Sequence, residues 1–219
     1  METTIRTFMK HQVLALLLLA IPVSLIPAHP HMSLESRLEF EFIGTTCSGL
    51  WVDWTLDPFF SASIIQENDL DRNKRFDAKE NARVHDTAFA NLRKFGWFTY
   101  IRTGNTRFSP GKVERFEASI KSDRLVYRFF VPLADRNLGT DFSIAIFDST
   151  YFCAVSYPSD AAKASQTAAG QPTPSWTRET NKKFPVYYNP RGDVADGTLY
   201  KEWKPGLETA YPEEIRVRL

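Results

Sequence analysis

Hydrophobic and polar residues alternate with a period of two along much of the chain beyond residue 37. Such alternation is typical of β-strands that bury one face. The expected strands are Leu38–Phe42, Leu50–Leu56, Trp97–Arg102, Arg115–Ile120, Leu125–Leu133, Phe142–Ile146, Tyr151–Val155 and Glu214–Leu219. Turn residues separate them at regular intervals, which favours an antiparallel β-sandwich over a parallel sheet.

Between residues 57 and 96 the pattern changes to helical spacing. Asp57 followed by Pro58 is typical of a helix start, because Asp accepts backbone N–H bonds and Pro fits the first turn. A second helix is expected from the helical spacing of Val84, Ala88, Leu92 and Phe95, with Gly96 as its cap. The sequence therefore predicts a helix pair inserted between two strands.

The segment between these two helices, Asp69–Glu80, has the ligand spacing of an EF-hand calcium loop. Calcium prefers roughly six to eight oxygen ligands. The expected ligands are the side chains of Asp69, Asp71, Asn73, Asp77 and Glu80 and the backbone carbonyl of Arg75. The predicted fold class is thus α+β, an antiparallel β-sandwich-like domain with an inserted EF-hand-like helix-loop-helix.

Two features of the loop depart from strong calcium sites. Its sixth position, where the chain turns sharply and Gly is usual, is Lys74. A residue with a Cβ held at positive φ costs on the order of 1 kcal/mol. The four acidic side chains are also balanced by four basic ones, Arg72, Lys74, Arg75 and Lys79. We therefore expect weak calcium binding, and the alternative is a degenerate loop that keeps the shape without the ion.

The first 28 residues resemble a secretory signal peptide. A basic start is followed by the apolar run Val13–Ile26, and Pro27-Ala28 supplies a small residue for cleavage. The run is short for a transmembrane helix and contains Pro22, although an uncleaved anchor is the alternative. We expect a periplasmic or secreted protein.

Cleavage after Ala28 would leave His29 and His31 at the mature N-terminus. A terminal His offers its free amine and its imidazole to one metal, and imidazole suits copper, nickel and zinc. Both histidines are therefore candidate ligands for a transition metal. The alternative is a solvated terminus without a ligand role.

The two cysteines, Cys47 and Cys153, can form a disulfide in an exported chain, or they are two buried thiols on separate strands. The formal net charge of +1 gives no basis for bulk attraction to nucleic acid or to an anionic membrane. No catalytic motif is evident, and no small-molecule substrate is indicated, so we expect a protein that is not an enzyme.

The expected organisation has four parts. The signal peptide at 1–28 precedes a β domain at 29–158 that carries the helix-loop-helix insertion at 57–96. Residues 159–175 are rich in Ala, Ser, Gln and Pro and are expected to form a linker. Residues 176–219 are expected to be largely irregular, except for the last strand.

Several of these motifs resemble an uncharacterised periplasmic family, whose members are described as periplasmic components of metal-type ABC transport systems. The resemblance rests on His29-Pro30-His31, Trp51 and Trp54 with Phe60-Ser61, the acidic loop, Asn91–Phe98 and Phe147–Phe152. It covers His29 to about Val155 and implies an accessory factor near a nickel, cobalt or zinc transporter. Lys74 departs from the family's usual Gly, and the chain after Ser156 is not covered.

These observations lead to one main hypothesis and three alternatives. The main one is an exported, non-enzymatic calcium-binding protein that assists transition-metal transport, with a membrane metal transporter as partner. The second is a periplasmic copper, nickel or zinc carrier that binds its metal through His29 and His31. The third is a purely structural or interaction domain with a degenerate loop, and the fourth is a copper enzyme acting at His29.

Overall fold

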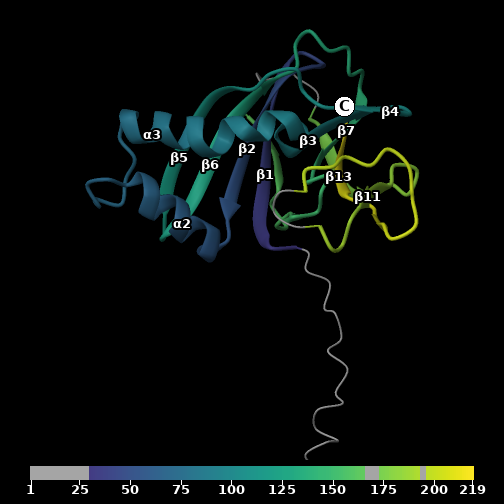
Figure 1. Ribbon diagram of the computed structural model, residues 1–219. Coiled ribbons are helices and arrows are strands. Elements are labelled where there is room, and N and C mark those ends of the chain that lie inside the picture. The colour runs from purple at the N-terminus through teal and green to yellow at the C-terminus, as the bar shows by residue number, and fades with distance from the viewer. Residues whose placement is uncertain (1–29, 166–172, 193–195) are drawn as a thin grey trace, which may run out of the picture.

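The protein is mostly β, with a small group of helices across one sheet (Figure 1). The computed structural model describes residues 30–165, 173–192 and 196–219. The first sheet contains β1 (Met32–Ile43), β2 (Thr46–Leu56), β5 (Glu114–Lys121), β6 (Arg124–Pro132), β8 (Cys153–Ser156) and β9 (Ala162–Ala164). The second contains β3 (Thr99–Thr103), β4 (Thr106–Phe108), β7 (Asp141–Ile146), β10 (Ser175–Thr180) and β13 (Glu213–Arg218). A separate hairpin pairs β11 (Val186–Tyr188) with β12 (Glu208–Ala210).

The first sheet is mixed rather than purely antiparallel. Its order is β5-β6-β2-β1-β8, and β9 also pairs with β1. Both β8 and β9 run parallel to β1, so the prediction of antiparallel pairing is wrong at this edge. β9 lies inside the expected linker at 159–175. Residues 162–164 of that segment therefore pair with β1 as part of the first sheet. Residues 166–172 of that linker lie outside the described residues.

The second sheet is antiparallel, in the order β10-β13-β7-β3-β4. The expected strand at Glu214–Leu219 is confirmed as β13, which returns to pair with β7. β10 lies in the segment that was expected to be irregular. It was missed because it is an edge strand with mostly exposed side chains, so its hydrophobic alternation is weak.

One hydrophobic core joins the two sheets and the helices. Alternate residues of β1, β2 and β6 point into it, as the period-two pattern predicts. Phe40 on the first sheet and Phe142 on the second meet edge to face, with ring centroids 6.2 Å apart. Each large apolar side chain that is fully buried in this way contributes about 1.5–3 kcal/mol of transfer free energy.

The helical region consists of α2 (Pro58–Asn68), α3 (Ala78–Val84), a π-helical segment η1 (His85–Phe89) and a 3-10 segment η2 (Ala90–Phe98). In Figure 1 these helices lie across β5, β6 and β2. The predicted start of α2 is confirmed, because the Asp57 side chain accepts the N–H of Phe60 at 2.9 Å. The same carboxylate accepts the N–H of Ser33 at 2.8 Å and so ties α2 to β1.

The second helix is not the continuous α-helix that the sequence predicts. A π-helix closes hydrogen bonds five residues apart, so the residue that follows Val84 into the core is Phe89 rather than Ala88. Phe89 is fully buried against Trp54, Tyr127 and Phe129. The expectation for Ala88 is wrong because it assumed an unbroken 3.6-residue period.

The predicted strand at Trp97 begins two residues later than expected, at Thr99. Gly96, Trp97 and Phe98 all have left-handed φ angles, of 62°, 48° and 51°. Extended strand backbone needs negative φ, so β3 cannot start before this turn ends. At Gly96 a Cβ would lie 2.5 Å from the Cβ of Ser109, which explains why glycine occupies the turn.

Of the two alternatives for the cysteines, the disulfide is wrong, since Cys47 on β2 and Cys153 on β8 are both free and buried. Cys47 pairs with Phe42 at one end of β1, and Cys153 pairs with Met32 at the other. The two partners are ten residues apart along β1 (42 minus 32), which is roughly 33 Å of strand. A disulfide needs Cα atoms within about 7 Å, so this fold cannot form one.

The expected signal peptide lies outside the described residues, which begin at Pro30. Within the described parts of the chain, the helices are all too short or too polar to cross a bilayer. The localisation therefore stays a prediction from the sequence.

Candidate functional site

The acidic loop 69–80 joins the end of α2 to the start of α3 and is fixed to the first sheet from both sides. Behind it, the Asn81 amide donates to the carbonyl of Ala118 at 2.8 Å and accepts the N–H of the same residue at 3.3 Å. At its tip, Lys74 Nζ lies 2.8 Å from Asp123 Oδ1 in the β5–β6 turn. The hydrogen bond to Asp123 raises the pKa of Lys74. The Lys74 side chain therefore points away from the loop, toward the turn between β5 and β6.

Three of the six predicted calcium ligands converge. Carboxylate oxygens of Asp69, Asp71 and Glu80 all lie within 4.8 Å of one another. Asp69 and Glu80 are buried, with 7% and 4% of their surface exposed, whereas Asp71 is exposed. Among the described residues, these three carboxylates are the group of His, Cys, Asp or Glu side chains close enough together to hold a metal ion. Hard oxygen donors of this kind suit calcium or magnesium rather than a soft metal.

The turn of the loop is held by hydrogen bonds to its first residue. Asp69 Oδ1 accepts the N–H of Asn73 at 3.1 Å, and Asp69 Oδ2 accepts the N–H of Lys74 at 3.0 Å. Arg72 and Lys74 have left-handed φ angles of 60° and 63°. The sixth position thus takes the conformation that usually calls for glycine, although it carries a Cβ.

Glu80 connects the two ends of the loop. Its Oε1 accepts the N–H of Leu70 at 2.7 Å, and its Oε2 accepts the N–H of Asp77 at 3.1 Å. Asp77 in turn accepts the N–H of Glu80 at 2.8 Å, which completes a capping box at the start of α3. The carboxylate that would close a calcium shell is therefore placed beside Asp69 by the helix cap itself.

The remaining predicted ligands lie around this group rather than in it. Asn73 Nδ2 donates to Asp71 Oδ2 at 2.7 Å, and Asn73 Oδ1 accepts the N–H of Arg75 at 2.8 Å. Asp77 serves as the helix cap. The structure thus brings together Asp69, Asp71 and Glu80, with Asn73 bonded to two of them.

The histidine proposal concerns a different part of the molecule. His29 lies outside the described residues. His31 is exposed, and its ring stacks on Phe152 with centroids 4.8 Å apart. Its backbone N–H donates to the carbonyl of Phe152 at 2.9 Å, so the chain is already fixed at the start of β1. No metal-ligating group among the described residues includes His31.

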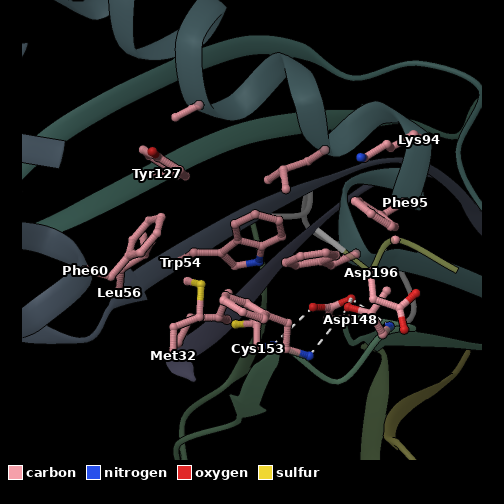
Figure 2. Close-up of a pocket in the computed structure, with 17 residues that line it drawn as sticks. Met32, Trp54, Leu56, Phe60, Lys94, Phe95, Tyr127, Asp148, Cys153 and Asp196 are labelled. Atoms are coloured by element: carbon pink, nitrogen blue, oxygen red, sulfur yellow. Dashed lines mark hydrogen bonds between the residues drawn. The ribbon is translucent and has the colours of Figure 1, made fainter. Parts of the chain in front are cut away.

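A second feature, which the sequence did not reveal, is an apolar cavity between the helices and the first sheet (Figure 2). It has a volume of about 240 Å³. Its walls include Met32, Trp54, Phe60, Leu92, Phe95 and Tyr127. These residues come from five separate elements, β1, β2, α2, η2 and β6, so no local motif could have predicted the cavity.

One side of the cavity is polar. Asp148 is buried there, and its carboxylate accepts the N–H of Thr150 at 2.8 Å, the hydroxyl of Thr150 at 2.8 Å and the N–H of Cys153 at 3.1 Å. These neutral donors hold the carboxylate inside the protein. Burial, with the nearby negative charge of Asp148, raises the pKa of the Cys153 thiol, which argues against a nucleophilic role.

Two similar proteins extend the comparison to other organisms. An uncharacterized 15.5 kDa protein in the trpE 3' region of Spirochaeta aurantia is 33% identical over 90 residues. That match covers 41% of this chain and 64% of the Spirochaeta protein, which is less than two thirds of its length. An uncharacterized protein of Haemophilus influenzae is 26% identical over 152 residues, which is 67% of this chain and 71% of that protein.

No solved structure matches this chain. The family model described as "Protein of unknown function (DUF1007)" matches residues 14–219, which include the loop, the cavity and the C-terminal strands. This match extends well beyond Val155, where the motifs that carry the family resemblance end. On this match, the chain belongs to the DUF1007 family.

Proposed function

We propose that this protein binds calcium through the loop 69–80 and that the ion fixes the helix pair on the first sheet. The observation that carries the proposal is the convergence of Asp69, Asp71 and Glu80 within 4.8 Å. The spacing of these residues in the sequence, the left-handed turn at Lys74 and the flanking helices support an EF-hand-like assignment.

The expected affinity is weak. Basic residues within the loop balance its acidic ones, and Glu80 must exchange two backbone N–H bonds for the ion if it is to bind with both oxygens. Calcium sites of extracellular modules bind in the range of about 10⁻⁴–10⁻³ M. Such a site is filled where calcium is millimolar, which fits the exported location expected from the N-terminus.

The role is structural in this proposal. α2 and α3 both pack on the first sheet, and the loop joins them. An ion that binds only the folded loop stabilises the native state by RT ln(1 + [Ca²⁺]/Kd). The proposal assigns no reaction to the protein. The membrane metal transporter implied by the family resemblance stays a prediction.

Thermal unfolding in calcium tests the proposal. At 10 mM CaCl₂ and a Kd of about 10⁻⁴ M, the stabilisation is about 2.7 kcal/mol, which is roughly 5–10 °C in Tm for a chain of this size. Glu80→Gln should abolish the shift while keeping a capping-box side chain. Glu67→Gln, an exposed change on α2, should keep it. A wild-type Tm that does not change with calcium would identify the loop as degenerate.

A further inference from the structure

The apolar cavity between the helices and the first sheet has one charged end. Figure 2 shows Asp148 and Asp196 on the side of Phe95, whereas Phe60 and Leu56 lie on the opposite side. All five residues line the cavity. A molecule that fills it would therefore meet carboxylates at one end and hydrocarbon at the other.

Asp148 is a buried carboxylate whose hydrogen-bond donors are all neutral. It is 4% exposed. Its Oδ1 accepts the N–H and the hydroxyl of Thr150, and its Oδ2 accepts only the N–H of Cys153. Because each carboxylate oxygen can accept two hydrogen bonds, Oδ2 has room for one further donor.

Asp148 also has no cation beside it. Among the described residues, no Lys, Arg or His nitrogen lies within 4.0 Å of its carboxylate. It does not belong to a group of described side chains that could hold a metal ion either. Buried charges in proteins are usually paired or bound to a metal, because removing an unpaired charge from water is costly. A positively charged ligand would supply the missing partner.

The buried part of the charged end is negative. Burial raises the pKa of the Cys153 thiol, and the negative charges of Asp148 and Asp57 raise it further. Lys94 also lines the cavity, but it is exposed and its Nζ lies over the Phe95 ring, 4.7 Å from the centroid. Solvent and salt screen an exposed charge much more than a buried one. An anionic ligand would therefore be repelled by Asp148.

Aromatic rings form much of the apolar wall. Six of them line the cavity: Trp54, Phe60, Phe95, Phe98, Tyr127 and Phe152. Phe98 stacks on Trp54 with centroids 5.7 Å apart, and its centroid lies 6.3 Å from that of Phe95. The face of an aromatic ring attracts a cation, and cages of such rings recognise organic ammonium groups. The wall and the carboxylate thus favour a ligand of the same charge.

We propose that the cavity binds a primary organic ammonium ion, which donates a hydrogen bond to Asp148 Oδ2 and directs its apolar part toward Phe60. The size of the ligand follows from the volume. A cavity of about 150 Å³ holds benzene, so one of about 240 Å³ has room for a phenyl ring with a short chain. The proposal does not depend on calcium, because no residue of the loop 69–80 lines the cavity.

The test compares three probes of similar size in phosphate buffer with EDTA. 2-Phenylethylamine is cationic at pH 7, 3-phenylpropionate is anionic and propylbenzene is neutral. The protein has three methionines, and Met32→Leu assigns the methyl signal of Met32, a residue of the cavity wall, in a ¹H–¹³C NMR spectrum. The amine should shift this signal and bind roughly 10-fold or more tightly than 3-phenylpropionate.

Asp148→Asn removes the charge and keeps the size of the side chain. It should weaken binding of the amine roughly 10-fold, because a hydrogen bond to a charged group is lost. Binding of propylbenzene should not change, which shows that the cavity of the variant is intact. Asp135→Asn is the matched control, since Asp135 is exposed and lies outside the cavity. This variant should bind both probes as the wild type does.

Three results would overturn the proposal. They are equal binding of the amine and 3-phenylpropionate by the wild type, a Met32 signal that the amine does not move, and an unchanged affinity for the amine in Asp148→Asn. The first two need only the wild type once its signal is assigned, so they decide the matter if Asp148→Asn does not fold. None of them bears on calcium binding, because the buffer contains EDTA.

Discussion

The backbone N–H of Lys74 donates a hydrogen bond of 3.0 Å to Asp69 Oδ2, so the sixth residue of the acidic loop closes back on the first. Lys74 reaches this position with a φ of 63°, and its side chain leaves the loop toward Asp123. Lys74 therefore forms the turn that an EF-hand-like loop requires at its sixth position, although the usual glycine is missing.

Replacing Lys74 by glycine should stabilise the ion-free protein. Lys74→Gly removes both the Cβ at positive φ and the exposed ion pair with Asp123, whereas Lys74→Ala removes only the ion pair. The glycine variant should have a Tm roughly 1–4 °C above the alanine variant, measured in EDTA. The two variants should bind calcium with similar affinity, since the turn is already in place. An alanine variant that is the more stable of the two would show that Lys74 is not strained.

The C-terminal strand should depend on one buried carboxylate. Glu214 is fully buried on β13, with Arg102 Nε 2.7 Å from its Oε2 and Arg107 Nη2 2.7 Å from its Oε1. Glu214→Gln leaves Arg107 without its counter-charge and leaves Arg102 with only Glu179, whose Oε1 lies 3.3 Å from its Nη2. The change should cost about 3–5 kcal/mol in denaturant unfolding. Glu213→Gln, at an exposed neighbouring position, should change stability by less than about 0.5 kcal/mol. Equal effects of the two changes would contradict the account.

The two thiols should be separate and unreactive in the native protein. Burial raises the pKa of Cys47 to about 12 and also raises the pKa of Cys153. Ellman's reagent at pH 8 should therefore react slowly with native protein and should find two thiols after denaturation without reductant. Denatured protein with no free thiol would show a disulfide and would contradict the strand register.

Acid should weaken the link between α2 and β1. Burial alone would raise the pKa of Asp57, but the N–H groups of Phe60, Ser33 and Phe59 lower it below its ordinary value of 3.8. The unfolded chain therefore binds the proton more tightly, so this stabilisation is present above about pH 3.8 and is lost as the pH falls through the folded-state pKa.

Asp57→Asn keeps a helix cap but cannot ionise. Its Tm should fall less steeply than that of the wild type between about pH 5 and pH 3. Calorimetric scans at several pH values measure both slopes. Identical slopes would mean that Asp57 does not contribute to the acid transition.

Features that depend on nearby residues could be predicted from the sequence. The ligand spacing of Asp69–Glu80, the cap at Asp57 and most strands follow from local chemistry and alternation, and the structure contains a loop between helices where they were expected. The π-helical segment could not be predicted, because Phe89 becomes a core residue only when the helical period lengthens at His85.

Features that depend on register could not be predicted. The sequence allowed a disulfide between Cys47 and Cys153. The register excludes it, because the residues of β1 that pair with the two cysteines, Phe42 and Met32, are ten positions apart. Ser36, Trp54 and Tyr127 likewise lie next to one another only because β1, β2 and β6 pair in this register. In the sequence these three residues are ordinary members of alternating strands.

Isothermal titration calorimetry of the purified protein with CaCl₂ tests the calcium proposal most directly. The wild type should bind one ion with a Kd of about 10⁻⁴–10⁻³ M, and Glu80→Gln should give no binding heat, while Glu67→Gln should match the wild type. Absence of calcium-dependent heat in the wild type at millimolar calcium, or the same heat in Glu80→Gln, would contradict the proposal.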